Sequence, residues 1–396
     1  MSFRKIKPGT ILTIAGLSLV ATSSAFAFDG PIKLGNTAPY SGPASAYGTI
    51  GAAESAYFQM LNDKGGINGH KVEFITLDDA YSSPKTVEQT RRLVEQDEVL
   101  AMFSSVGTAP NIAVQKYLNA KKVPQIFVSS GASRWNDQKH FPWTVGLNPT
   151  YELEGRVYAK YILKTKPDAK IALIIPNEDA GKDYLRGFKE GLGDHVKQLV
   201  STTTYLTTDP TIDSQIVSMQ QSGADVFFVE ATPKFAAMAI KKVASLGWKP
   251  LMILPAVSNS VAAVLKPAGL ENSVGVVTGL YLKDPADKAL ADDPAVKDYL
   301  AWMKKYRPSA DPGDLLNVQG YTAAQLMARV LSNCKDDLSR ANIIKQATHL
   351  TDVELPMLLP GIKINTSPEN STPIQQMKMA RFDGKAWVLF GDVIGE

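Results

Sequence analysis

The sequence predicts an α/β protein built as two Rossmann-like parallel-sheet lobes. From Ile32 onward, short apolar runs alternate with segments of helical period, which is typical of parallel sheets with helices on both faces. The alternation starts again after residue 150. The chain has 396 residues, more than the roughly 250 to 300 that one hydrophobic core holds. We therefore expect two domains.

The first lobe begins with a strand over 32–36. In the segment that follows, apolar residues recur at the spacing of one helical face: Ala53, Ala56, Tyr57, Met60 and Leu61. Lys64-Gly65-Gly66 ends that helix. The same alternation predicts strands over 72–77, 99–103 and 125–128, with helices over 85–96 and 111–120.

The second lobe repeats this order. We expect helices over 152–163, 184–192, 214–220 and 235–246, and strands over 170–175, 198–205, 225–229 and 251–254. Around 143–146 and 276–279 an apolar strand meets a glycine without a linker, which indicates crossovers between lobes. Helices near 295–306, 315–331 and 340–348 follow, and then strands over 375–382 and 386–390. The Asp383-Gly384 turn makes that last pair a hairpin.

Residues 1–27 have the features of a cleaved signal peptide. Three basic residues, Arg4, Lys5 and Lys7, precede an apolar run over 11–21, and Ala25-Phe26-Ala27 gives a cleavage site. No later stretch reaches the roughly 18 apolar residues that a transmembrane helix needs. No cysteine follows the cleavage site to carry a lipid anchor. The sequence therefore predicts an exported, freely diffusing protein.

Charge and motifs exclude several classes of function. Of the 42 Lys and Arg, three lie in the leader, so 39 remain against 39 Asp and Glu, and we expect no nucleic-acid partner. The single cysteine, Cys334, rules out an intramolecular disulfide. The four histidines are far apart, so no metal site is expected. Because acyl-transfer, phosphate-binding and dinucleotide-binding motifs are also absent, we expect no cofactor and no enzymatic activity. An enzyme with a site assembled from distant residues is the weaker alternative.

Three loops rich in glycine and hydroxyl side chains follow predicted strands of the first lobe. They span 39–48, 104–108 and 129–133. Ligands of open α/β sheets bind at the carboxyl ends of strands, and loops that lead into helices offer N–H and O–H donors to an anion. Each loop alone is equally explained by helix capping. Because all three converge on one sheet edge, with Thr108 and Ser130 on neighbouring strands, the sequence favours a carboxylate site.

At these loops the sequence resembles the branched-chain amino-acid binding proteins of ABC transporters, which are type I periplasmic binding proteins. The resemblance rests on Ser41-Gly-Pro-Ala-Ser-Ala-Tyr-Gly48, Asn62-Asp-Lys-Gly-Gly-Ile-Asn-Gly69 and Asp78-Asp79, and covers essentially the whole mature chain. It implies a periplasmic, monomeric protein that delivers a small molecule to a membrane permease. It also implies three crossovers, with 28–146 plus 280–358 as lobe 1 and 147–279 plus 359–396 as lobe 2. A ligand-sensing domain that reports to a receptor is the alternative role.

The resemblance also implies site residues. In the first lobe, the positions that match carboxylate-binding loops are Thr108 and Ser129, Ser130 and Gly131, and Tyr47 packs beside the ligand. In the second lobe we expect Asp179, Glu230 and Ala256 to line the site. Ala256 stands where amino-acid-binding relatives carry the acid that pairs with the ligand ammonium.

Two aromatic positions of those relatives fall at or near Ala180 and Ala231 in this chain. Since a buried ammonium without a partner costs several kcal/mol, the loss of the acid favours a larger carboxylate without an amine, such as a benzoate or cinnamate derivative. Glu230 keeps the alternative open, because it can replace the missing acid for a branched-chain or other hydrophobic amino acid.

Overall fold

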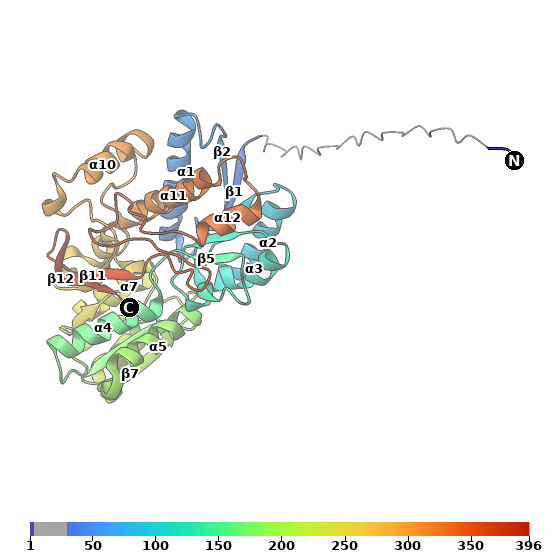
Figure 1. Ribbon diagram of the computed structural model, residues 1–396. Coiled ribbons are helices and arrows are strands. Elements are labelled where there is room, and N and C mark those ends of the chain that lie inside the picture. The colour runs from blue at the N-terminus through green and yellow to red at the C-terminus, as the bar shows by residue number, and fades with distance from the viewer. Residues whose placement is uncertain (4–29, 396) are drawn as a thin grey trace.

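The computed structural model describes residues 1–3 and 30–395. Apart from its first three residues, the predicted signal peptide lies outside them. The described chain forms two α/β lobes, one with a sheet of five strands and one with a sheet of seven. Figure 1 shows α1, α11 and α12 in one lobe and α4, α5 and β7 in the other. The predicted fold class is therefore confirmed.

The five-stranded sheet is wholly parallel, in the order β2-β1-β3-β4-β5. Both faces of its inner strands are covered, so their residues are nearly all buried, as a parallel sheet requires. Helices α1 (Gly48–Asp63), α2 (Ser83–Glu95) and α3 (Thr108–Ala120) connect its strands. The strands are β1 (Ile32–Ala38), β2 (Val72–Asp78), β3 (Ala101–Phe103), β4 (Gln125–Val128) and β5 (Thr144–Gly146).

The seven-stranded sheet has the order β12-β11-β10-β9-β8-β6-β7. Its strands from β10 to β7 are parallel, and β11 and β12 add an antiparallel pair at one edge. That pair is the predicted hairpin, and Gly384 takes φ +101° in its turn. The strands are β6 (Ile171–Pro176), β7 (Leu199–Tyr205), β8 (Val226–Val229), β9 (Leu251–Ile253), β10 (Val277–Leu280), β11 (Gln376–Phe382) and β12 (Trp387–Gly395).

Four longer helices accompany the second sheet: α4 (Tyr151–Thr165), α5 (Asp179–Leu192), α6 (Asp213–Gln221) and α7 (Pro233–Ser245). The expected crossover strands are present as β5 and β10. After β10 the chain returns to the first lobe as α10 (Pro294–Tyr306), α11 (Leu315–Cys334) and α12 (Arg340–Ala347). Helix α11 packs closely on α1, because a Cβ at Gly320 would lie 2.4 Å from the carbonyl oxygen of Ile50.

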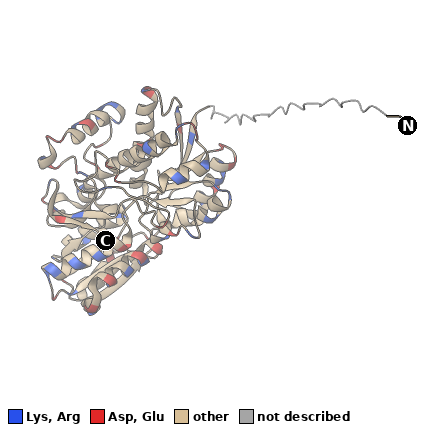
Figure 2. Cartoon of the chain, in the orientation of Figure 1, with Lys and Arg blue, Asp and Glu red and all other residues tan. Residues whose placement is uncertain are grey.

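The chain crosses between the lobes after β5, after β10 and again before β11. We propose that lobe 1 comprises residues 28–146 with 280–358, and that lobe 2 comprises residues 147–279 with 359–396. Figure 2 shows Lys and Arg mixed with Asp and Glu over both lobes. Within the described chain, no helix combines the length and apolar character needed to span a bilayer.

Two segments differ from the sequence prediction. Helix α5 begins at Asp179 rather than at residue 184, because Gly181 packs directly against the end of β6, where a Cβ would lie 2.3 Å from the Pro176 oxygen. Residues 256–273 form short helical pieces that have no clear period to predict them: η4 (Ala256–Ser258), η5 (Val261–Leu265), α8 (Lys266–Ala268) and α9 (Leu270–Ser273).

Candidate ligand-binding site between the lobes

Two hydroxyls meet at the carboxyl edge of the first sheet. Thr108 opens α3 just after β3, and Ser130 follows β4. Their Oγ1 and Oγ atoms are 2.8 Å apart, and the two residues are 1% and 0% exposed. The parallel order of β3 and β4 brings these loops together, as the sequence predicts. The amino end of a helix of 13 residues also supplies N–H groups beside them.

Glycines keep the backbone close around these hydroxyls. Gly107 adopts φ +101°, and a Cβ there would lie 2.5 Å from the Tyr81 ring. A Cβ at Gly131 would lie 2.3 Å from the Pro149 oxygen and 2.7 Å from the Tyr151 ring. Any larger residue at Gly131 must therefore displace the first crossover segment.

Ser129 is connected to the far helix of the same lobe. Its Oγ accepts a hydrogen bond of 3.0 Å from Gln319 Nε2, which also lies 3.3 Å from Asn148 Oδ1. Gln319 was not predicted as a site residue. No local signal distinguishes it, because segment 315–331 also carries the polar residues Asn317, Gln325 and Arg329.

From the second lobe, Glu230 directly follows β8 and is 4% exposed. Its Oε2 makes no hydrogen bond to any residue of the described chain. Burial, and then the charges on Glu178 and Glu154, raise the pKa of Glu230 well above its ordinary value. Burial therefore disfavours the ionised form of this carboxyl unless a partner with a donor or a positive charge reaches it.

Glu154 on α4 is the carboxyl that stands beside Ala256. It accepts hydrogen bonds from Tyr158 Oη at 2.7 Å, Tyr184 Oη at 3.0 Å and the Ala256 backbone N–H at 3.0 Å. Burial raises the pKa of Glu154 to about 7, and these donors offset part of that shift. Ala256 thus contributes its backbone to this group, and Glu154 was not predicted from the sequence.

Tyrosines from both lobes surround these carboxyls. Tyr47 is 7% exposed and packs with Val106 and Leu316 of its own lobe. Burial, followed by Tyr151, Tyr205, Glu230 and Glu178, raises the pKa of Tyr47 well above its ordinary value, so groups of both lobes surround it.

Tyr151, at the start of α4, joins the first-lobe hydroxyls to this aromatic cluster. Its hydroxyl lies 3.4 Å from Ser130 Oγ, and its ring stacks on Tyr184 at 4.5 Å. In the second lobe, Tyr205 Oη accepts a hydrogen bond of 3.0 Å from the backbone N–H of Thr232. Neither Tyr151 nor Tyr205 was predicted as a site residue.

Asp179 does not contact these buried carboxyls and tyrosines. Its carboxylate pairs with Lys182 on its own helix at 3.0 Å, and its side chain is 46% exposed. The preceding residue, Glu178, contacts the first lobe instead, since Tyr81 Oη donates to Glu178 Oε1 at 3.3 Å. Burial raises the pKa of Glu178 to about 7.

Direct contacts hold the two lobes together over this site. Asp183 Oδ2 on α5 accepts hydrogen bonds from the N–H and Oγ of Ser133 at 2.8 and 3.1 Å. On the other side of the site, Ser260 Oγ donates to Asp314 Oδ1 at 2.8 Å. Thr108, Ser130 and Glu230 are almost completely buried in this arrangement of the lobes.

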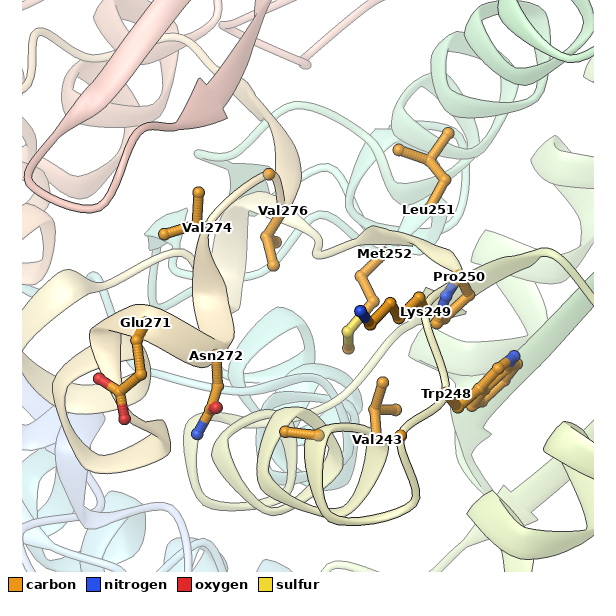
Figure 3. A pocket seen from close by; sticks show the side chains of 13 residues that line it. Val243, Trp248, Lys249, Pro250, Leu251, Met252, Glu271, Asn272, Val274 and Val276 are labelled. Atoms are coloured by element: carbon orange, nitrogen blue, oxygen red, sulfur yellow. The ribbon is translucent and has the colours of Figure 1, made fainter.

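A separate pocket lies elsewhere in the second lobe. It measures about 520 Å³, and Trp248, Lys249, Glu271 and Asn272 are among its lining residues. Figure 3 shows Lys249 and Met252 on one side of it and Asn272 on the other. It adjoins the start of β9, whereas Ala256 follows the end of that strand. We place the ligand site at the carboxyl edge, where open α/β sheets bind ligands, rather than at this pocket.

The family described as "Periplasmic binding protein" matches residues 31–386, nearly the whole described chain. The chain belongs to the periplasmic binding protein family. This binding protein is 22% identical over 380 residues to Leu/Ile/Val-binding protein homolog 7 of Brucella suis biovar 1 (strain 1330), covering 91% of this chain and 92% of the relative. It is 24% identical over 290 residues to the leucine-specific-binding protein of Salmonella typhimurium, covering 70% and 75%.

Solved structures share its fold. A branched-chain amino acid ABC transporter protein from Thermus thermophilus with bound valine superposes with TM-score 0.82 at 16% identity, covering 93% of this chain and 97% of the other. A solute-binding protein of an ABC transporter from R. palustris in complex with benzoate gives TM-score 0.78 at 20% identity, covering 93% and 98%.

Family membership confirms several predictions for this binding protein. The resemblance to branched-chain amino-acid binding proteins is confirmed by the family match and by the relatives. Members of the family are periplasmic, bind small molecules and work with ABC transporter permeases. Because they bind solutes rather than transform them, the prediction that the chain is not an enzyme is also confirmed.

Proposed function

We propose that this binding protein captures a small carboxylate in the periplasm and hands it to an ABC permease when its lobes close. The observation that carries the proposal is the buried pair of hydroxyls on Thr108 and Ser130, 2.8 Å apart beside the amino end of α3. A carboxylate has two oxygens that accept hydrogen bonds, and helix N–H groups and hydroxyls supply donors for both.

The proposed export route uses the predicted signal peptide, residues 1–27, and the mature protein acts as a monomer. The proposed ligand contacts in the first lobe are Tyr47, Thr108, Ser129, Ser130 and Gly131. In the second lobe they are Glu230 and the backbone at Ala256, and Glu178 takes the place expected for Asp179.

An aromatic acid is the first candidate ligand. The site is surrounded by tyrosine rings, and the side chains at Ala231 and Ala256 are small, which favours a flat and bulky body behind the carboxylate. A solute-binding protein of the same fold from R. palustris BisB5 is in complex with 3,4-dihydroxy benzoic acid, at 20% identity and TM-score 0.77, covering 92% of this chain and 97% of the other.

A hydrophobic amino acid is the second candidate, and Glu230 is the observation that favours it. This buried carboxyl has an oxygen without a partner in the described chain and can accept a ligand ammonium. An ammonium paired with Glu230 removes the cost of burying that charge alone. The similarity to Leu/Ile/Val-binding protein homologues agrees with this candidate.

A thermal-shift panel separates the candidates. It contains leucine, isoleucine, valine, phenylalanine, benzoate, hydroxybenzoates and hydroxycinnamates. A ligand at 100 times its dissociation constant adds about 2.7 kcal/mol to the free energy of unfolding, which gives a clear shift. Stabilisation by aromatic acids supports the first candidate, and stabilisation by leucine without any aromatic acid supports the second. No stabilisation by any of these carboxylates would contradict carboxylate capture itself.

A further inference from the structure

Three carboxyls of the second lobe that lie near one another, Glu154, Glu178 and Glu230, differ in how their oxygens are satisfied. Glu154 accepts hydrogen bonds from three donors, two tyrosine hydroxyls and one backbone N–H. Glu178 accepts one from Tyr81. Glu230 is 4% exposed, and its Oε2 has no donor anywhere in residues 30–395. Only Glu230 therefore has a fully buried acceptor left over.

Residues of both lobes lie near Glu230. Glu230 lies at the carboxyl end of β8, at the sheet edge that meets the first lobe. The pKa of Tyr47, a residue of the first lobe, is raised first by burial, then by Tyr151 and Tyr205, and next by the charge of Glu230. It also acts on Tyr151, whose hydroxyl lies 3.4 Å from Ser130 Oγ. Glu230 thus shares its surroundings with the residues of the proposed carboxylate cradle.

The charged groups around Glu230 supply no donor. The groups that act on Glu230 are Glu178 and Glu154, both acidic, and both disfavour its ionised form. The tyrosines around it do not fill the gap, because no hydroxyl of the described chain hydrogen-bonds to Glu230 Oε2. A buried acceptor that stays unpaired is costly, so a complementary ligand brings an N–H or O–H group to this point.

We propose that Glu230 is a specificity-determining residue that accepts a hydrogen bond from the ligand, so that the preferred ligands carry a donor in addition to their carboxylate. The chemical class is then small amino acids or hydroxy acids, phenolic acids included, in preference to plain carboxylic acids of the same shape. This inference rests on the proposed function, because it assumes that the carboxylate lies on Thr108 and Ser130.

The test compares ligands that differ only by the donor. Isothermal titration calorimetry on the mature protein uses two pairs: benzoate with 4-hydroxybenzoate, and 3-phenylpropionate with phenylalanine. A site built to hydrogen-bond a donor rejects an analogue that lacks it by a large factor, up to about 10⁴-fold. We expect the donor-bearing member of at least one pair to bind at least about 10-fold tighter.

Variants then assign that preference to Glu230. Glu230→Met removes the acceptor at similar volume and should bring the two members of the pair to within about threefold. Glu230→Gln keeps an acceptor oxygen but no charge. It should spare a hydroxy acid and weaken an amino acid, which distinguishes the two sources of the donor. Glu230→Gln also allows the test of Glu230 to be made if Glu230→Met does not fold. The matched control is Glu369→Gln, an exposed residue, which should leave every affinity unchanged.

Three outcomes overturn parts of this account separately. If both members of each pair bind equally well, the donor requirement is wrong and carboxylate capture stands. If the donor-bearing ligands bind tighter but neither Glu230 variant changes the ratio, Glu230 is not the residue that reads the donor. If no carboxylate binds at all, the proposed function fails, and this inference fails with it.

Discussion

The hydroxyls of Thr108 and Ser130 lie 2.8 Å apart and are fully buried, although 22 residues separate them in the chain. Each follows a strand of the same parallel sheet, so the topology of the sheet positions both. Two hydroxyls this close can satisfy each other, and they can also turn together toward an anion. The second property is the basis of the proposed carboxylate cradle.

Thr108→Ala removes one of these hydroxyls. We expect it to weaken carboxylate binding by roughly 1 to 3 kcal/mol, because the ligand loses a donor inside a buried site. Titration calorimetry with the tightest ligand of the thermal-shift panel measures the loss. Thr202→Ala, at an exposed position of β7, is the control and should change nothing. An unchanged affinity for Thr108→Ala would remove this residue from the site.

Gly131→Ala tests the close approach of the first crossover to the cradle. The added Cβ would lie 2.3 Å from the Pro149 oxygen, so the crossover must move and stability should fall by roughly 1 to 3 kcal/mol. Ligand affinity should fall with it. Gly313→Ala is the control, because the nearest atom to its new Cβ is 3.4 Å away. Its free energy of unfolding should match that of the parent protein. Equal melting temperatures for the two variants would show that Gly131 is not constrained.

Asp183→Asn weakens the contact between α5 and Ser133 that holds the lobes together. Because closure is needed for tight binding, we expect affinity to fall roughly 10-fold through a larger open population. Small-angle X-ray scattering with subsaturating ligand should show a larger radius of gyration. Asp194→Asn, at an exposed position, is the control. The closure role is contradicted if affinity and radius both match the parent protein.

Glu54 on α1 gives a prediction for pH. It is 0% exposed, and neither of its oxygens hydrogen-bonds to the described chain. Burial raises the pKa of Glu54 well above its ordinary value of 4.5. Below pH 4.5 the folded and unfolded states both hold the proton. Above it only the folded state does, so this group lowers stability by about 1.4 kcal/mol per pH unit until Glu54 itself ionises.

Glu54→Gln should therefore match the parent protein near pH 4 and be more stable at pH 7. Urea unfolding at both pH values measures the difference. A variant that is less stable at pH 7 would show that Glu54 is ionised and paired in the folded protein.

Most of the fold follows from local patterns. The run over 171–175 is apolar at every position because β6 is covered on both faces, and the apolar face of 53–61 has a clear helical period. The start of α5 and the pieces over 256–273 did not follow, since Gly181 is helical only through its packing and very short helices have no measurable period.

Some of the site residues could likewise be predicted from the sequence, and others could not. Thr108 and Ser130 could be predicted because neighbouring parallel strands end at one edge. Glu178 and Tyr81 could not, because their contact depends on how the two lobes meet. Gln319 could not, because its contact with Ser129 joins positions 190 residues apart, and no local pattern encodes that geometry. A shift of one residue separates Asp179, which faces Lys182, from Glu178, which faces the first lobe.

A crystal structure of the protein with its bound ligand tests the central claim most directly. The account predicts a carboxylate within hydrogen-bonding distance of Thr108 Oγ1 and Ser130 Oγ, enclosed by both lobes. A ligand bound in the pocket beside Trp248, or one whose acidic group lies away from these two hydroxyls, would contradict it.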